Sequence, residues 1–381
     1  MTIRSCCVAI VAVLGSAFAA EKTTPFEGEL APFLGVAEIS KEQVFSGGRF
    51  PNITIAADGT VLAVFGKGGV RVRRSEDGGK TWGEEIVIAE PGFMGAGVTV
   101  DENTGDVLAF VEAGHPPAPV KVYRSKDHGK TWAVQVTDIK QDGRGNAPSM
   151  HMNETGSTLR HGKHAGRLIR PSRYYGKRNA REEWPEHYTN AIYSDDGGKT
   201  WKTSDPFPKN GTGEACIVEL SDGSIYYNSR RHWANKGENP RRRWTAWSDD
   251  GGHTWKDVAI CEVLPDGDQD RDYGLMGGLV RLPVAGKDVL VFSNIVSPGG
   301  RHHGTVWASF DGGKTWPVKR LVTEGGFGYS SMAAGMPGTP GEGKIYLMFE
   351  SGGAKVATFN LSWLVEGEAT KDGEIPDWAI K

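Results

Sequence analysis

The sequence predicts an all-β protein folded as a six-bladed β-propeller. The pattern Ser-x-Asp-x-Gly-x-Thr-Trp occurs five times at intervals of 50 to 69 residues, which is typical of a repeat architecture. Runs of alternating apolar and polar residues precede the boxes and indicate strands. The chain of 381 residues holds 53 Gly and 12 Trp, which suits a turn-rich β protein. The boxes start at Ser75, Ser125, Ser194, Ser248 and Ser309.

Each box is expected to be a tight turn that follows a strand. Residues 70–74, 120–124 and 191–193 alternate in polarity immediately ahead of the first three boxes. An Asp carboxylate accepts hydrogen bonds from the amides of its own turn, Gly supplies the positive backbone angles, and Trp packs back on the sheet. We therefore expect the five box aspartates to be structural.

Further short strands are expected between the boxes, at residues 60–65, 106–111 and 224–228. Several strands per repeat, arranged radially, make the blades of a propeller. Residues 331–359 are expected to form a sixth blade that lacks a box. Residues 160–187 are interpreted as a long loop over one face. No linker divides the chain, so residues 20–381 are expected to form one propeller domain.

The first residues, MTIRSCCVAIVAVLGSAFAAEK, have the pattern of a signal peptide over residues 1–19, which predicts export to a periplasm or outside the cell. The apolar run is short for a membrane span. A net charge of −3 gives no basic footprint for nucleic acid. Cys216 and Cys261 are the two cysteines beyond this segment, and whether they pair is left open.

The repeated box resembles the Asp-box of sialidases, and further motifs extend the likeness over about residues 44–366. They follow one another in the order of the sialidase family, which makes the resemblance specific. The matching segments are Gly48-Arg49-Phe50-Pro51, Glu214 to Arg230, Ser293-Asn294 with Arg301, Tyr329-Ser330-Ser331-Met332, Phe349-Glu350, and Phe359 to Leu364.

The resemblance implies a site for an acidic sugar. Arg49, Arg230 and Arg301 match the three arginines that bind the sialic acid carboxylate, and Glu350 matches the residue that supports the first of them. Arginine suits this role because its planar fork pairs with both carboxylate oxygens and stays charged. The three arginines come from separate predicted blades, so they could converge at one central pocket.

The resemblance also implies an exo-sialidase reaction with retention, in which Tyr329 is the nucleophile and Glu214 its base. A carboxylate nucleophile would be repelled by the carboxylate of the substrate, and sialidases use Tyr instead. A phenol has an ordinary pKa near 10 and needs a base beside it.

The sequence departs from the family at the proton donor. Sialidases carry an acid/base Asp between the first arginine and the first box, but here Phe65 to Arg71 contains no acidic residue. A neighbouring loop could supply the donor, and Glu112, His115 and Asp101 are the candidates. Alternatively, the substrate carries a good leaving group or is a different acidic sugar, or the protein binds without cleaving. Losing a general acid costs on the order of 10² to 10⁴ in rate.

Two other functions remain open. The first is a hydrolase or lyase acting on another acidic sugar such as a uronic acid, and the second is a non-catalytic glycan-binding propeller. Residues 167–175, 184–188 and 230–233 concentrate Arg, His and aromatic residues, which fits an acidic-glycan subsite or a solvated loop. The partner expected in each case is an acidic glycan. No metal site and no cofactor are expected, because no His spacing repeats as metal ligands do.

Overall fold

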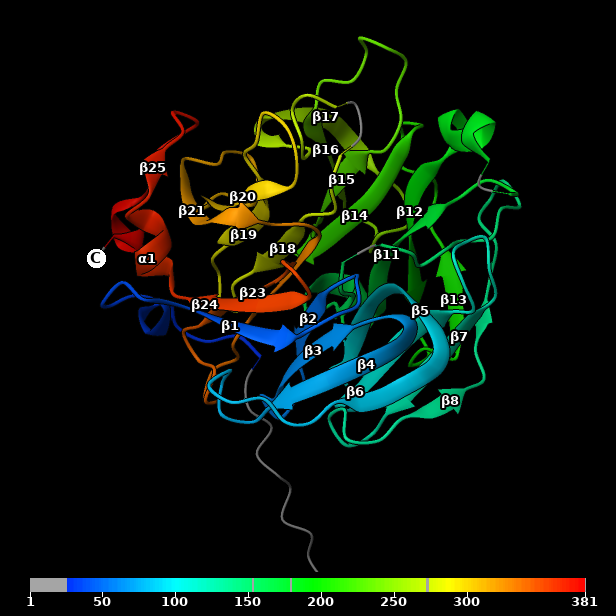
Figure 1. Cartoon of the computed structure of the whole chain (residues 1–381), viewed down its shortest axis with the longest axis horizontal. Coiled ribbons are helices and arrows are strands. Elements are labelled where there is room, and N and C mark those ends of the chain that lie inside the picture. The colour runs from blue at the N-terminus through cyan, green and yellow to red at the C-terminus, as the bar shows by residue number, and fades with distance from the viewer. Residues whose placement is uncertain (1–25, 153, 179, 272–273, 381) are drawn as a thin grey trace, which may run out of the picture.

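The computed structural model of the chain describes residues 26–152, 154–178, 180–271 and 274–380. Within these residues the strands form five sheets arranged around a centre (Figure 1), so the prediction of an all-β, propeller-like architecture is confirmed. In Figure 1, β2, β14 and β18 lie nearest the centre, whereas β8, β17 and β25 lie at the periphery. The predicted signal peptide, residues 1–19, lies outside the described residues.

The five sheets follow the chain almost in order. The first contains β2 (Asn52–Ile55), β3 (Val61–Phe65), β4 (Lys67–Ser75), β5 (Ile86–Asp101), β6 (Asp106–Glu112), β7 (Val120–Ser125) and β8 (Ala133–Gln135). The second contains β10 (Ser157–Thr158), β11 (Leu168–Tyr174), β12 (Tyr188–Ser194), β13 (Thr200–Thr203) and β9 (Asp138–Ile139). The third contains β14 (Thr212–Glu219), β15 (Ile225–Arg231), β16 (Arg242–Ser248) and β17 (Lys256–Pro265).

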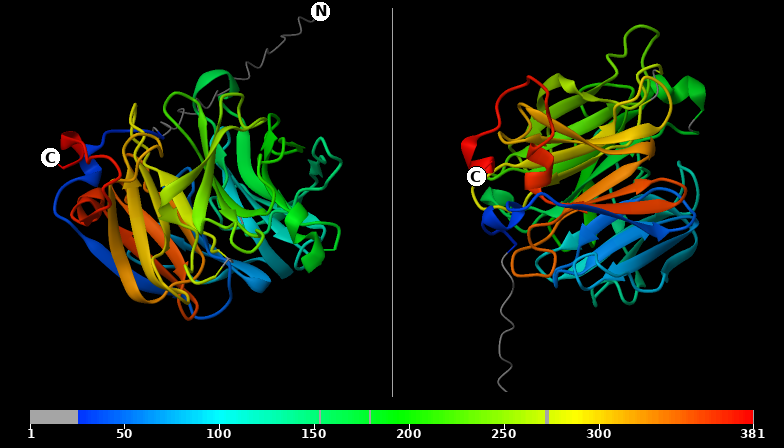
Figure 2. Two further views of the ribbon diagram at one scale, coloured as in Figure 1. Left: turned by 90° about the horizontal axis from the view of Figure 1, so that it is seen from above. Right: turned by 60° about the vertical axis from the view of Figure 1, so that its left-hand side comes forward.

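The last two sheets complete the ring. The fourth contains β18 (Gly278–Arg281), β19 (Leu290–Ile295), β20 (His302–Ser309), β21 (Val318–Gly326) and β25 (Glu368–Ala369). The fifth contains β22 (Ser330–Ala334), β23 (Ile345–Glu350), β24 (Ala354–Phe359) and β1 (Ile39–Phe45), so a strand from the beginning of the described chain pairs antiparallel with one near its end. The short helix α1 (Leu361–Val365) packs on β20 and β21 (Figure 2).

The number of hydrogen-bonded sheets differs from the six blades expected, because the first sheet has seven strands. Its long strand β5 pairs with β4 through residues 86–93 and with β6 through residues 93–101. The β5–β6 register shifts twice, between residues 94 and 96 and between 96 and 99. Continuous pairing along β5 therefore joins two groups of strands that each contain a Ser-x-Asp box.

The boxes are the turns that the sequence predicts. Asp250 accepts hydrogen bonds from Ser248 Oγ at 2.8 Å, Thr254 Oγ1 at 2.6 Å, and the amides of His253 and Thr254 at 2.9 and 3.0 Å. Burial raises the pKa of Asp250, but these hydrogen bonds outweigh it and lower the pKa to about 2. Similar contacts recur at Asp77, Asp127, Asp196 and Asp311, so the structural interpretation of the boxes is confirmed.

The interpretation of residues 160–187 as a loop is wrong. This range contains β11, which lies between β10 and β12 in the second sheet and is buried along almost its whole length. Arg170, Pro171 and Arg173 interrupt the apolar pattern of this strand, which is why its sequence reads as a loop. Both Cys216 and Cys261 are free thiols. Within the described ranges, no helix has the length and apolarity needed to cross a bilayer.

Candidate functional site

Four of the predicted site residues meet at one face of the propeller and are called the outer cluster: Arg49, Arg301, Tyr329 and Glu350. Each lies at or next to the end of a strand, ahead of β2, β20 and β22 or at the end of β23. The guanidinium carbons of Arg49 and Arg301 lie 5.1 and 4.7 Å from the centre of the Tyr329 ring. Two cations therefore flank the side chain that matches the family nucleophile.

Glu350 holds the outer cluster together through four hydrogen bonds. Its Oε1 accepts from Arg49 Nε at 3.2 Å and from the Phe50 amide at 3.0 Å, and its Oε2 accepts from Arg49 Nη2 and the Tyr329 amide, both at 3.4 Å. Phe50 has φ of 66°, a strained value for this residue type, and its bond to Glu350 helps to hold it there. A Cβ at Gly328 would lie 2.5 Å from Glu350 Oε2, so only glycine leaves room for the carboxylate.

The outer cluster borders an open cavity of about 310 Å³, lined by Arg49, Arg301, Phe327, Glu350 and neighbouring glycines. Arg301 is exposed and Arg49 keeps 39% of its side-chain surface, so both cations can meet a ligand from solvent. Burial lowers the pKa of Arg49, but the charge and hydrogen bonds of Glu350 outweigh it and leave that pKa raised. A carboxylate is the type of group that such an arginine pair binds.

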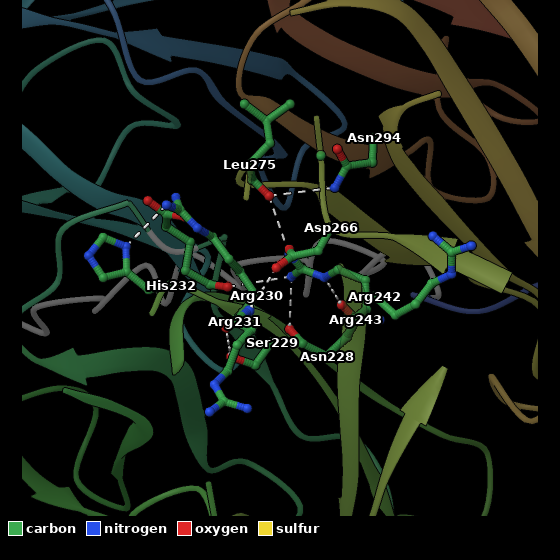
Figure 3. Close-up of polar contacts among 12 residues, drawn as sticks. Asn228, Ser229, Arg230, Arg231, His232, Arg242, Arg243, Asp266, Leu275 and Asn294 are labelled. Carbon is green, nitrogen blue, oxygen red and sulfur yellow. Dashed lines mark hydrogen bonds and ion pairs between the residues drawn. The ribbon is translucent and has the colours of Figure 1, made fainter. Parts of the chain in front are cut away.

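The other two predicted residues, Glu214 on β14 and Arg230 on β15, lie in a separate group with Arg173 and His232, which we call the inner cluster. Glu214, Arg230 and Arg173 have no exposed surface. Arg230 Nη1 donates to Glu214 Oε2, and Arg230 Nη2 lies 3.0 Å from His232 Nδ1 (Figure 3). Arg173 Nη1 lies 3.9 Å from Glu214 Oε1. Glu214 is thus a carboxylate between two buried guanidinium groups.

A group of aromatic rings, the ring cluster, lies between the two clusters and consists of Phe50, Phe93, His115, His151 and Tyr175. Centroid distances of 4.7 to 5.6 Å link Phe50 to Phe93 and His151, His151 to Phe93 and His115, and His115 to Tyr175. At one end Phe50 stacks on Tyr329 at 6.1 Å, and at the other Arg173 lies 3.9 Å from the centre of the Tyr175 ring. Tyr175 and His151 are buried, whereas His115 is exposed.

Charged groups of both clusters affect the pKa of Tyr175. Burial is the main cause that raises the pKa of Tyr175 above its ordinary value; the charges of Glu214 and Tyr329 raise it further and that of Arg173 opposes them. The inner and outer clusters are therefore close neighbours, and the rings of His115, His151 and Tyr175, which contact one another, lie between them.

The three candidate proton donors lie in different surroundings. Asp101, at the end of β5, accepts hydrogen bonds from the amide and side chain of Asn103 and lies 3.8 Å from Arg124, so it serves a turn. Glu112 is fully buried at the end of β6, where it accepts from Ser149 Oγ at 2.7 Å and the Met150 amide at 3.0 Å. Burial outweighs these bonds and raises the pKa of Glu112 to about 7.

His115 is the candidate at the surface of the ring cluster. Burial of part of the ring lowers the pKa of His115, the Pro116 carbonyl opposes this, and the charge of Arg173 adds to it. His115 is thus a member of the ring cluster, and Glu112 accepts hydrogen bonds from Ser149 and Met150, just ahead of His151. Asp101 belongs to a turn.

A second buried network supports the inner cluster from behind. Arg243, on β16, donates to Asn228 Oδ1 at 2.6 Å, Asp266 Oδ1 at 2.9 Å and the Leu275 carbonyl at 3.2 Å (Figure 3). Burial raises the pKa of Asp266 to about 7, against the opposing charges of Arg243 and Arg230. Because protein groups accept the hydrogen bonds that Arg243 donates, we assign Arg243 a structural role.

The sequence places Arg173, Tyr175 and His187 in segments that fit either an acidic-glycan subsite or a solvated loop, and the concentration of Arg, Tyr and His is the signal for the subsite. The His187 ring lies 5.4 Å from that of Tyr175. His151 follows no matching motif, so no signal pointed to it. Within the described part of the chain, no set of three or more His, Cys, Asp or Glu side chains is arranged to hold a metal ion.

Comparison with known proteins identifies relatives of this architecture. The family described as "BNR repeat-like domain" matches residues 66–340. A sialidase of Micromonospora viridifaciens is 32% identical over 90% of this chain and 56% of its own length, and an anhydrosialidase of Macrobdella decora is 30% identical over 51% of this chain and 24% of its own length. The chain thus spans about half the length of the first of these relatives.

Solved structures agree on the fold. The Hadza microbial sialidase Hz136 superposes with a TM-score of 0.64 at 23% identity, over 83% of this chain and 66% of that one. The intramolecular trans-sialidase of Ruminococcus gnavus, in complex with oseltamivir carboxylate, gives a TM-score of 0.63 at 17% identity, over 85% of this chain and 98% of that one. At these identities the likeness is one of fold.

Proposed function

Since this chain belongs to the BNR repeat-like domain family as a sialidase-type propeller, we propose that it is a glycoside hydrolase that releases a terminal sialic acid. The observation that carries the proposal is the outer cluster, in which Arg49 and Arg301 flank Tyr329 beside an open cavity. Within this proposal the two groups of strands that share β5 count as separate blades, which gives six.

In the proposed reaction Arg49 and Arg301 bind the sugar carboxylate, and Glu350 keeps Arg49 in place. Tyr329 Oη forms a bond to the anomeric carbon as the bond to the leaving oxygen breaks, and the phenol proton passes to Glu214. Water then attacks the same carbon and gives its proton to the group that protonated the leaving oxygen, while Glu214 returns the phenol proton to Tyr329 Oη as the bond from Tyr329 to the anomeric carbon breaks, with retention. The charges of Glu214 and Tyr329 both act on Tyr175, which supports the role of Glu214 near Tyr329, and Arg230 donates to Glu214.

We assign proton donation to the leaving oxygen to His115. Of the three candidates it alone is exposed and lies on the ring cluster that reaches Tyr329. Its lowered pKa implies that the donor form accumulates on the acid side of neutrality. The test compares His115→Asn and Glu112→Gln on a sialoside with an aryl leaving group and one with an alkyl leaving group. A loss confined to the alkyl substrate in His115→Asn supports the assignment, and the same loss in Glu112→Gln transfers the role to that residue.

The main experiment measures turnover of an aryl sialoside, which needs little leaving-group protonation, by the chain without residues 1–19. Tyr329→Phe and Arg301→Ala are expected to lose at least about 10³-fold and 10²-fold in kcat/KM, respectively. Tyr193→Phe is the matched control, because Tyr193 also lies under an arginine, Arg167 at 4.3 Å, and does not belong to the outer cluster. No turnover by the folded wild type would sink the sialidase proposal. Export of the chain remains a proposal from its first 19 residues.

A second candidate is a hydrolase or lyase for a uronic acid. The neighbouring rings of His115, His151 and Tyr175 favour it, because such groups suit abstraction of a proton next to a carboxylate. Formation of an unsaturated product from a uronate polymer, detected by its absorbance, would identify a lyase and overturn the sialidase proposal. Binding of an acidic glycan without any turnover would instead identify a non-catalytic propeller.

A further inference from the structure

Arg173 stands apart from the other buried arginines of the inner cluster and its support. It has no exposed surface, and none of its three guanidinium nitrogens donates a hydrogen bond to any described residue. Arg230 and Arg243, by comparison, donate to side chains or carbonyls. A guanidinium carries five N–H donors and stays charged, so burying it without acceptors costs free energy.

The groups around Arg173 do not neutralise it. Glu214, at 3.9 Å, is shared with Arg230, so one carboxylate faces two guanidinium groups. Glu112 Oε1 accepts hydrogen bonds from Ser149 and Met150, and burial raises the pKa of Glu112 to about 7, so at neutral pH this group carries only part of a negative charge. The remaining titratable neighbours, His115, His187 and His232, are neutral bases whose pKa values fall, with burial as the main cause and the charge of Arg173 adding to it. The inner cluster thus keeps about one excess positive charge.

A glycine, Gly213, lies beside both Arg173 and His232. A Cβ at Gly213 would lie 3.4 Å from Arg173 Nη1 and 2.7 Å from His232 Cβ. One face of the guanidinium is covered by the Tyr175 ring, and Tyr175 is in turn covered by His115, the exposed member of the ring cluster. A ligand that displaces His115 and Tyr175 would meet the donors of Arg173 next to Glu214.

We propose that Arg173 is a specificity-determining residue that binds a second negatively charged group, such as a sulfate or carboxylate, on an acidic sugar whose first carboxylate is held by Arg49 and Arg301. This inference rests on the proposed function for where the sugar lies. The class of ligand is therefore a dianionic sugar, and charge-assisted hydrogen bonds from the planar guanidinium would recognise its second anion.

The stability of the free protein gives the first test. Arg173→Met removes a buried charge whose donors are unmet, so its melting temperature is expected to equal or exceed that of the wild type. Arg167→Met is the matched control, because Arg167 also lies over a tyrosine ring but donates to Asp195 at 2.7 and 3.1 Å and to the Gly251 carbonyl at 3.0 Å. The control is expected to melt lower. An equal loss in both variants would give Arg173 a structural role and overturn the proposal.

Binding gives the second test. Dissociation constants are measured by calorimetry for sialic acid, glucuronic acid and galacturonic acid, each beside its mono-O-sulfated isomers. At least one sulfated isomer is expected to bind the wild type and Arg167→Met about tenfold or more tightly than its parent, a preference of about 1.4 kcal/mol. In Arg173→Met the preference is expected to shrink to about twofold or less while the parent sugar still binds.

The outcomes separate the two proposals. A preference for a sulfated uronic acid that depends on Arg173 supports this inference and overturns the sialidase proposal. Binding of sialic acid without any preference for a sulfated isomer, or a preference that survives in Arg173→Met, overturns the inference and leaves the sialidase proposal standing. If no acidic sugar binds the folded wild type, both are wrong.

Discussion

The carboxylate of Glu350 is the support on which the outer cluster depends, and Glu350→Gln removes its charge at nearly constant volume. Its two oxygens each accept two hydrogen bonds, and together they hold the Arg49 side chain and the amides of Phe50 and Tyr329. An amide offers one oxygen and one NH₂ group. Whichever way it turns, two of the four donors will face another donor.

The magnitude follows from the burial of each contact. The Glu350 side chain is 14% exposed, so losing a backbone bond to Phe50 or Tyr329 is expected to cost about 1 kcal/mol of unfolding free energy. The Arg49 side chain is 39% exposed, and its ion pair is discounted for solvent to at most about 1 kcal/mol. The total is about 1 to 2 kcal/mol. We expect a larger effect on function, a fall of about 10- to 100-fold in kcat/KM, because Arg49 loses its orientation.

Urea denaturation and turnover of an aryl sialoside measure the two effects separately. Glu366→Gln is the control, because Glu366 forms an exposed ion pair with Arg320 at 3.4 Å, and its stability should change by less than about 0.5 kcal/mol. Wild-type kcat/KM in Glu350→Gln, with stability lowered as expected, would refute the idea that Arg49 must be held in place for substrate binding.

Three further predictions concern stability and pH. The pKa of Asp250 lies at about 2, so its contribution is present above about pH 4 and is lost as pH falls toward 2; Asp250→Asn should cost about 1 kcal/mol at pH 7 in urea and flatten this slope. Glu112 holds its proton to about pH 7 in the native state, so stability due to this group falls as pH rises from its ordinary pKa of 4.5, and Glu112→Gln should be relatively more stable at pH 8 than at pH 5. Burial lowers the pKa of His187 to about 3, so the unfolded chain binds that proton first and stability falls from pH 6.5 downward; a His187→Gln variant whose melting temperature keeps the wild-type pH dependence would contradict this.

The sequence predicted the fold class and the box turns because both rest on local rules. Asp and Gly at fixed offsets dictate a turn, and alternation of apolar residues dictates a strand, so β3, β6 and β15 appear where expected. The strand β11 was missed because its buried arginines face polar groups of distant strands, which a local pattern cannot represent. Arg170, for example, donates to the Gly97 carbonyl on β5.

The sequence predicted the part of the site that lies in matching motifs but not how the part outside them is arranged. Motif order identified Arg49, Arg301, Tyr329 and Glu350, and these residues do meet. Glu214 and Arg230, from one matching segment, lie on the neighbouring strands β14 and β15. Their isolation behind the ring cluster could not be foreseen, since it depends on His151 and Tyr175, which come from segments without a matching motif.

The separation of the two clusters has a consequence for catalysis. A sugar carboxylate that enters the open cavity meets Arg49 and Arg301 first, whereas Arg230 is already engaged with Glu214 and has no exposed surface. For Arg230 to join Arg49 and Arg301 in binding the carboxylate, the rings of His115 and Tyr175 must move. The free energy of that movement weakens the observed binding. A substrate with a second anion for Arg173 would recover part of this cost, because it would give acceptors to a buried guanidinium that has none among the described hydrogen bonds.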